Sequence, residues 1–354
     1  MKNIYQELAD LLDQIPNGYP KTKSGVELKI LAKLFTEEEA KLATSLSLTP
    51  QSISEIAVKT SSVEALVKFS LITMVKKGLI ELRREEGKGL VFFLMPFVVG
   101  FYERQNAKID KEFALLFEEY YHEAFHHVMM VDPSVHRVIP VEKTIPVNID
   151  VMPYEKASTY LNEANSWGVL KCICRVQKQL IGKGCHHTVE NCLAFSTKTD
   201  AFSKSDAIRG ITKNEALQIL DDANKEGLVH STNNAQHDVT YICNCCTCSC
   251  GVLRGITEHG SLSAVASSDF YAVVDSDLCN GCEVCIDRCQ FNALSMNDGI
   301  SMVNTIFCFG CGLCVSACSS EALSLVQKDA DKIKIPPMSE EDWRQKRSST
   351  RQKL

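Results

Sequence analysis

Eight cysteines in the last quarter of the sequence have a spacing that suits metal ligation. They form two runs of the pattern C-x₂-C-x₂-C-x₃-C, and the second run repeats the first at an offset of 29 residues. The runs are Cys279, Cys282, Cys285, Cys289 and Cys308, Cys311, Cys314, Cys318. Thiolates two residues apart on a glycine-containing loop reach three irons of a cubane, so the fourth iron needs a ligand from another part of the chain.

The two runs resemble a bacterial ferredoxin domain with two [4Fe–4S] clusters, over about 60 residues. The resemblance implies that the last cysteine of each run crosses to the other cluster. One ligand set is then Cys279, Cys282, Cys285 and Cys318, and the other is Cys308, Cys311, Cys314 and Cys289. Proline usually follows the last cysteine of such runs, but this chain has Gln290 and Ser319. Zinc is the alternative, although zinc modules usually set two pairs of cysteines apart.

Nine further cysteines lie in the middle of the chain, in two groups whose spacing is not diagnostic. The first group is Cys172, Cys174, Cys185 and Cys192, and the second is Cys243, Cys245, Cys246, Cys248 and Cys250. Four cysteines of either group suffice for a [4Fe–4S] cluster, so we expect one or two more clusters, with zinc or free thiols as alternatives. If the second group is extended, Cys243 and Cys245 face one side and the other three face the opposite side, so one segment can serve two sites.

Several residues near these cysteines have an expected role. Arg175 follows Cys174, and we expect it to donate a hydrogen bond to a cluster sulphide. We interpret His186 and His187 as lying outside the set of metal ligands. Thr212 and Glu215 form a capping box that begins a helix ending near Gly227, and this helix can bring the two groups of cysteines together.

Residues 27–95 resemble a winged helix in the order of their elements. We expect helices over 28–35, 36–46, 51–60 and 63–77, followed by a hairpin of strands 79–83 and 90–94. The capping signals are Thr36 with Glu39, Thr49 before Pro50, and Gly78 at the end of the last helix. This stretch has 10 basic and 9 acidic residues, so a basic DNA-binding face is missing and DNA is not the favoured partner.

Residues 101–131 are predicted to form one long helix. It contains His122-Glu123-Ala124-Phe125-His126, the H-E-x-x-H pattern of zinc proteases, which puts both histidines on one helix face. The third ligand of such a site is not specified, since Glu142 and Glu155 are both only candidates. We therefore interpret the histidines as packing or solvated residues. Pro140, Pro146 and Pro153 then indicate an extended linker.

The composition describes an ordinary globular chain of 354 residues, 45% apolar and 23% charged, with a net charge of −6. This charge argues against general binding to nucleic acid or anionic membranes. The first ten residues are polar, and the longest apolar run is too short to span a bilayer. Seventeen cysteines in such a chain favour metal ligation in a reducing cytoplasm, and exposed clusters suggest an anaerobe. The basic segment 331–354 is expected to be a solvated tail, with a short helix near Trp343 capped by Ser339.

We therefore predict an α+β multidomain chain. Its parts are a winged-helix-like domain at 1–100, a long helix at 101–135, a cysteine-rich middle domain at 136–265, a ferredoxin-like domain at 266–330 and the basic tail. The favoured function is electron transfer through two or more [4Fe–4S] clusters, as a carrier or as a subunit of a redox complex with a redox partner protein. A redox-responsive winged-helix transcription regulator and a reductase with an open iron in the middle domain are the alternatives. Whether the chain forms a homodimer stays open.

Overall fold

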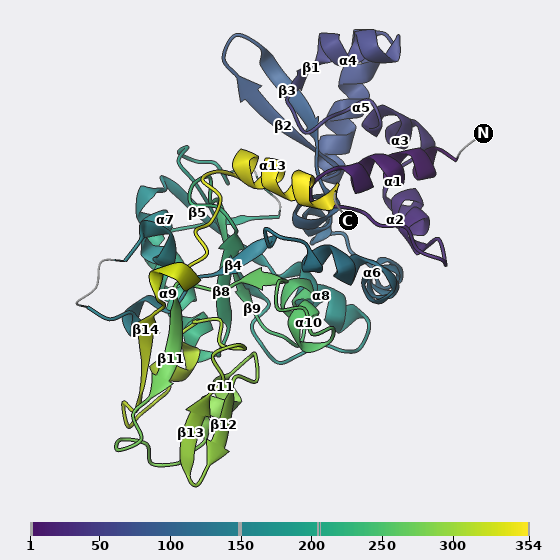
Figure 1. The fold of residues 1–354 in the computed structure, drawn as a ribbon. Coiled ribbons are helices and arrows are strands. Elements are labelled where there is room, and N and C mark those ends of the chain that lie inside the picture. Colours follow the sequence, from purple (N-terminus) through teal and green to yellow (C-terminus); the bar gives the residue numbers. More distant parts are fainter. Residues whose placement is uncertain (1–2, 148–150, 204, 206, 353–354) are drawn as a thin grey trace. The chain divides into compact units, whose positions relative to one another are not determined.

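The structure is a computed structural model that describes residues 3–147, 151–203, 205 and 207–352. The chain divides into two compact units (Figure 1), of which the first is Met1–Val128 with Leu180–Gly182 and the second is Met129–Gln179 with Lys183–Leu354. It is a mixed α/β chain with several sheets. Within the described ranges, every helix is too short or too polar to cross a membrane. The predicted linker passes through 148–150, which lie outside the described residues.

The first unit combines helices with a small sheet. Its elements are α1 (Ile4–Gln14), α2 (Val26–Leu34), α3 (Glu37–Ala43), β1 (Gln51–Ser52), α4 (Ile53–Thr60), α5 (Glu64–Lys77), β2 (Ile80–Glu85), β3 (Gly89–Leu94), two short turns (Phe97–Phe101 and Glu103–Gln105), α6 (Lys111–Glu123) and a 3-10 helix (Phe125–Met130). The sheet has the order β1-β3-β2 and is antiparallel.

Most of the local signals in this unit act as predicted, with one correction. Thr36 and Glu39 form the capping box that begins α3, and Gly78 ends α5 in the left-handed conformation. The helix predicted from residue 51 instead begins at Ile53. Ser52 caps it with Glu55, and Gln51 and Ser52 pair with β3. The serine cap competes successfully with the Thr49-Pro50 signal because its side chain accepts the backbone N–H of Glu55.

The predicted long helix over 101–131 is wrong. The Asp110 side chain accepts from the N–H of Phe113 and caps α6 at its start, and Ala124 has non-helical angles at its end. His122 and His126 therefore do not share a face of one helix. The Glu123 carboxylate accepts backbone hydrogen bonds from Lys23 and Ser24, so its role is to fix a loop of the first unit.

The second unit contains a seven-stranded sheet and two strand pairs. The elements are β4 (His136–Val138), α7 (Ala157–Glu163), β5 (Ser166–Lys171), α8 (Ile173–Leu180), β6 (Glu190–Ser196), β7 (Arg209–Ile211), α9 (Lys213–Lys225), β8 (Val229–Asn233), β9 (Tyr241–Cys245), α10 (Gly251–Thr257), β10 (Val265–Ala266), β11 (Phe270–Val274), α11 (Val284–Arg288), β12 (Leu294–Asn297), β13 (Ile300–Val303), α12 (Leu313–Ser316), β14 (Leu323–Gln327) and α13 (Glu340–Arg351), with 3-10 turns at Glu142–Thr144, Pro153–Glu155 and Ala330–Lys332. The large sheet has the order β10-β4-β8-β9-β6-β5-β7, and β11 pairs with β14 and β12 with β13.

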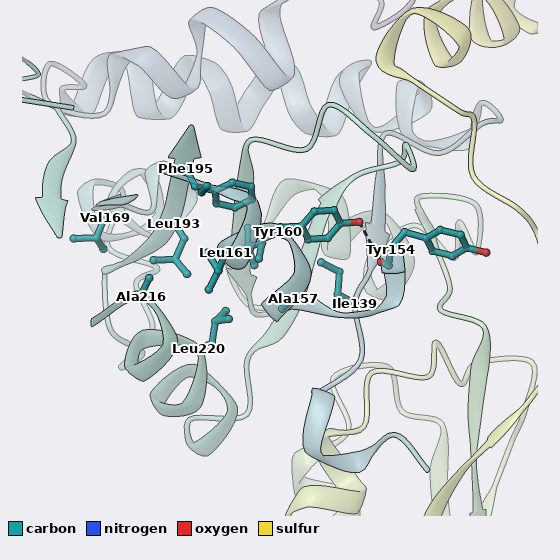
Figure 2. Packing of buried hydrophobic residues seen from close by; sticks show 12 residues of the cluster. Ile139, Tyr154, Ala157, Tyr160, Leu161, Val169, Leu193, Phe195, Ala216 and Leu220 are labelled. Atoms are coloured by element: carbon teal, nitrogen blue, oxygen red, sulfur yellow. Dashed lines mark hydrogen bonds between the residues drawn. The ribbon is translucent and has the colours of Figure 1, made fainter. Parts of the chain in front are cut away.

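Helices α7 and α9 pack on the large sheet over an apolar core (Figure 2). Leu161, Leu193 and Leu220 are among the buried members of this core, and the Tyr160 hydroxyl donates to the carbonyl of Tyr154 at its edge. Thr212 caps α9 as predicted. Burying these side chains supplies the hydrophobic free energy that holds the sheet strands with the central cysteines in place.

A buried charged network joins the large sheet to the β11–β14 pair. The Arg137 guanidinium in β4 pairs with the Glu155 carboxylate, and both side chains are almost completely buried. Arg137 also stacks over the ring of Tyr154, whose hydroxyl donates to Asp269 just before β11. Because removing one partner of a buried pair leaves an uncompensated charge, this network ties the two parts of the unit together.

The expectation of a solvated basic tail is wrong for the described part of that segment. Ser339 caps α13, as predicted. The Trp343 indole donates to the carbonyl of Ser134, and the fully buried Arg347 guanidinium donates to the carbonyl of Pro133. The ring of Trp343 and the guanidinium of Arg347, four residues apart on one helix face, both contribute to docking the helix, although the segment as a whole is basic.

We expect Gly310→Ala to destabilise the β11–β14 region by about 3 kcal/mol. Gly310 has φ +68, and an added Cβ would overlap the carbonyl oxygen of Phe270. Gly299→Ala is the matched control, because Gly299 has φ +79 but open space around it, so only the cost of the left-handed conformation, about 1 kcal/mol, applies. Denaturant unfolding of both variants measures the difference, and equal losses would contradict it.

Candidate metal centres

The strand pairs of the ferredoxin-like region bring the two cysteine runs together. In the β11–β14 pair Val274 is opposite Leu323, and in the β12–β13 pair Leu294 is opposite Val303. Cys279 is five residues after Val274, and Cys318 is five residues before Leu323. In the same way, Cys289 is five residues before Leu294, and Cys308 is five residues after Val303. Antiparallel pairing therefore places the last cysteine of each run beside the first cysteine of the other run.

Two cavities follow from this arrangement, each lined by four cysteines. The first is lined by Cys289, Cys308, Cys311 and Cys314 together with mainly apolar side chains. The second is lined by Cys279, Cys282, Cys285 and Cys318. Four thiols around an apolar space are the donor set that a [4Fe–4S] cluster needs. The eight cysteines of the two runs thus gather in the same two sets that the resemblance implies.

Backbone and hydroxyl donors point at several of these sulphurs. The N–H of Ala272 lies 3.4 Å from Cys308 Sγ, and the N–H of Ala293 lies 3.2 Å from Cys289 Sγ. In the other set, the N–H of Ser301 lies 3.5 Å from Cys279 Sγ. Such N–H···S hydrogen bonds stabilise the thiolate form and tune the reduction potential of a bound cluster.

Burial opposes ionisation of the thiols before metal is bound. It raises the pKa of Cys311 to about 12 and also raises the pKa of Cys314 above the usual value of a thiol. A metal ligand must be a thiolate, so the positive charge of the metal has to offset this cost. Metal binding at this set would therefore release protons.

The nine central cysteines separate into two groups, but not the two groups that follow one another in the sequence. Six thiols interact in a closed ring, in the order Cys172, Cys174, Cys250, Cys245, Cys243, Cys192 and back to Cys172. The other three lie together with a histidine. Cys185, His187, Cys246 and Cys248 bring their ligand atoms within 4.8 Å of one another. The structure therefore separates Cys185 from Cys172, Cys174 and Cys192, the cysteines with which the sequence groups it.

The six-thiol ring is built from residues in or next to four elements. Cys172 and Cys174 begin α8, Cys192 lies in β6, and Cys243 and Cys245 lie in β9. Cys250 begins α10. The hydrogen bonds that Cys174 and Cys192 donate to Cys172 lower its pKa well below the usual value, and those from Cys243 and Cys250 lower the pKa of Cys245 to about 6. The hydrogen bonds within the ring thus favour ionisation of Cys172 and Cys245 over that of their neighbours.

The Cys246–Cys248 loop supplies two members of the second group, and Cys185 and His187 supply the other two. The pKa of Cys246 is lowered to about 5 by a hydrogen bond from Cys248 and by the positive charge of Arg175, although burial opposes the shift. Burial lowers the pKa of His187, which keeps its imidazole neutral. Cys185 and Cys246 also pack with Ala223 and Leu228 in a small apolar core at the end of α9.

Arg175 is fully buried between the two groups. Its guanidinium donates to the carbonyls of Thr188 and Asn244 and to Oδ1 of Asn191, and it lies 3.5 Å from Cys246 Sγ. The structure thus gives it a thiolate and backbone carbonyls as partners. Its charge is also felt by Cys172 in the ring. One guanidinium therefore compensates negative charge in both groups.

Gln290 connects the ferredoxin-like region to the Cys246–Cys248 loop. Its side-chain carbonyl accepts from the N–H of Thr247 at 3.0 Å and from the Thr247 hydroxyl at 2.9 Å. Its amide group donates to the carbonyl of Gly227 at 3.1 Å. Ser319, the corresponding residue of the second run, is exposed. The residue that replaces the usual proline after Cys289 is therefore a docking contact.

Sequence reasoning missed two of these residues. The sequence interpretation places His187 outside the ligand set and gives Thr247 no role, whereas the structure brings His187 next to three thiols and bonds Thr247 to Gln290. A Cys-His-His sequence between two metal-rich segments is a signal for His187, since histidine and cysteine combine in zinc sites. No local signal exists for Thr247, because its partner is 43 residues away.

Comparisons with known proteins give one match. Residues 272–295 match the Fer4 family, a 4Fe-4S binding domain. No curated protein and no solved structure matches the chain. The match covers the first cysteine run, and together with the grouped cysteines it identifies an iron–sulphur protein with a ferredoxin-type region near its C-terminal end and at least one [4Fe–4S] cluster.

Proposed function

We propose that this chain is an electron-transfer protein that holds two [4Fe–4S] clusters in its ferredoxin-like region and passes electrons to or from a redox partner protein. The observation that carries the proposal is the pair of four-cysteine cavities. Bound there, each cluster would take up and release one electron. Cys279, Cys282, Cys285 and Cys318 would hold one cluster, and Cys289, Cys308, Cys311 and Cys314 the other.

The packing between the cavities supports transfer between them. Cys285 and Cys314, one from each set, belong to the same apolar core cluster with Phe270 and Leu325. This core shields Cys285 and Cys314 from water, which reduces the reorganisation that accompanies a change of charge on that side of each set. In an iron–sulphur carrier the residues position, bury and hydrogen-bond the cofactor, and no separate acid, base or nucleophile is required.

The six-thiol ring extends this proposal to the middle of the chain. Six thiols exceed the four that a single tetrahedral ion takes, and they suit a polynuclear iron–sulphur centre. We propose that the ring holds the further cluster of this protein. All seventeen cysteines are free thiols in the structure and are therefore free to serve as ligands.

The regulator alternative rests on the first unit. The order α3–β1–α4–α5–β2–β3, with a three-stranded sheet, supports a winged helix. The recognition helix of such a winged helix would be α5. Its solvent-exposed face carries large apolar side chains, since Leu66 is 67% exposed and Phe69 is 73% exposed. DNA backbones are bound by basic side chains, so this face suits a protein partner better than DNA.

We expect crossed ligation to appear in double variants. Cys279→Ala with Cys318→Ala should remove one cluster, about four irons, because both residues belong to one set. Cys308→Ala with Cys318→Ala should remove both clusters, about eight irons. Iron and sulphide analysis of anaerobically purified protein, with electron paramagnetic resonance after reduction, measures the loss. The reverse pattern would show that each run keeps its own fourth cysteine.

We expect Gln290→Ala to loosen the docking of the Cys246–Cys248 loop by roughly 1–2 kcal/mol, because three hydrogen bonds are lost. The amide of Thr247 should then exchange with solvent faster, measured by hydrogen exchange and mass spectrometry on the full chain. Ser319→Ala, at the corresponding position of the second run, is the matched control and should change nothing at Thr247. Unchanged exchange in Gln290→Ala would refute the docking role.

We expect the oxidised and the reduced protein to leave duplex DNA unshifted in gel mobility experiments at about 0.1 M salt, since α5 lacks a basic face. Binding that weakens steeply with salt and disappears in Lys68→Glu would instead favour the regulator. A Lys68→Gln variant separates loss of one positive charge from introduction of a negative charge.

A further inference from the structure

The group formed by Cys185, His187, Cys246 and Cys248 differs from the other cysteine sets in its dimensions. All four ligand atoms lie within 4.8 Å of one another, and Cys185 Sγ is 3.9 Å from Cys246 Sγ. A tetrahedral ion with metal–sulphur bonds of about 2.3 Å separates its sulphur ligands by about 3.8 Å. The outer thiolates of a cubane stand further apart, because irons and sulphides lie between them. The spacing therefore suits a single ion.

The types of ligand select the ion. Three thiolates and one imidazole are a common donor set of closed structural Zn²⁺ sites, and thiolate ligands disfavour Mg²⁺ and Ca²⁺. The four donors fill the tetrahedron, which leaves no open position for a substrate. The site is consequently structural in character.

The surroundings also fit a zinc centre. The Glu226 carboxylate lies 3.8 Å from Nδ1 of His187, so a negative charge stands next to the imidazole. Zn²⁺ with three thiolates and a neutral imidazole has a net charge of about −1. The buried Arg175 guanidinium, which donates to Cys246 Sγ, offsets this charge.

We propose that Cys185, His187, Cys246 and Cys248 bind one Zn²⁺ ion, separately from the six-thiol ring. The ion joins the loop after α8 to the Cys246–Cys248 loop. Thr247, between two of the ligands, is the residue that binds Gln290. The zinc site therefore fixes the surface on which the ferredoxin-like region docks. It does not depend on the electron-transfer proposal, because its donors are distinct from both ferredoxin sets.

The test measures metal content and coordination in the full chain purified without oxygen. We expect one zinc per chain, with X-ray absorption at the zinc edge showing three sulphurs at about 2.3 Å and one nitrogen at about 2.0 Å. His187→Ala should lose zinc to a chelator at least about tenfold faster than the unchanged protein. His186→Ala is the matched control, since His186 is the adjacent histidine outside the group, and it should keep its zinc.

Two further variants keep the test decisive if His187→Ala folds poorly. His187→Cys should retain one zinc, now with four sulphurs, and Cys192→Ser, in the six-thiol ring, should retain zinc with mixed ligands. A zinc centre with four sulphurs in the unchanged protein would refute the assignment, as would loss of iron instead of zinc from His187→Ala. If the unchanged protein contained zinc but no iron in its ferredoxin-like region, this result would contradict only the electron-transfer proposal.

Discussion

The central constraint in the second unit is the cost of burying negative charge next to many thiolates. The fully buried guanidinium of Arg175 offsets this cost. It donates to Cys246 Sγ, and its positive charge lowers the pKa of Cys246 and of Cys172. The same side chain donates to the carbonyls of Thr188 and Asn244. It thereby fixes the two chain segments that carry the cysteines. Without this cation, ionised thiols packed this closely would repel one another in a medium of low dielectric constant.

The alternation of side chains around the end of β9 explains why neighbouring cysteines serve different groups. Cys243 and Cys245 point to the ring from one face of the strand, as the period of two predicts. The chain then turns, so that Cys246 and Cys248 face His187 while Cys250, at the start of α10, returns to the ring. The sequence predicted that this segment can serve two sites. It did not predict the return of Cys250, because a period of two applies only while the strand continues.

The parts of the fold that were predicted from sequence depend on local signals. The Thr36 and Thr212 caps, the glycine end of α5 and the hairpin that follows it are set by neighbouring residues, and the structure has them. The prediction of one long helix is wrong because Asp110, inside an otherwise helical pattern, is a good N-cap and begins a separate helix there. The docked α13 and the Arg137–Glu155 pair escaped prediction for a different reason. Their partners are distant in sequence, and no periodicity encodes such contacts.

The Gln290–Thr247 contact shows how a departure from a repeated pattern can carry information. The two cysteine runs have the same spacing, yet they differ in the residue after the last cysteine: Gln290 bonds to Thr247, whereas Ser319 is exposed. A proline at 290 has no side-chain amide and can make neither of these contacts. With Gln290 in place of proline, the loop after Cys289 is less stiff but has a specific docking contact. Cys289 itself lines one of the two cavities. The asymmetry between the runs follows from this contact, since Ser319, at the corresponding position, is exposed.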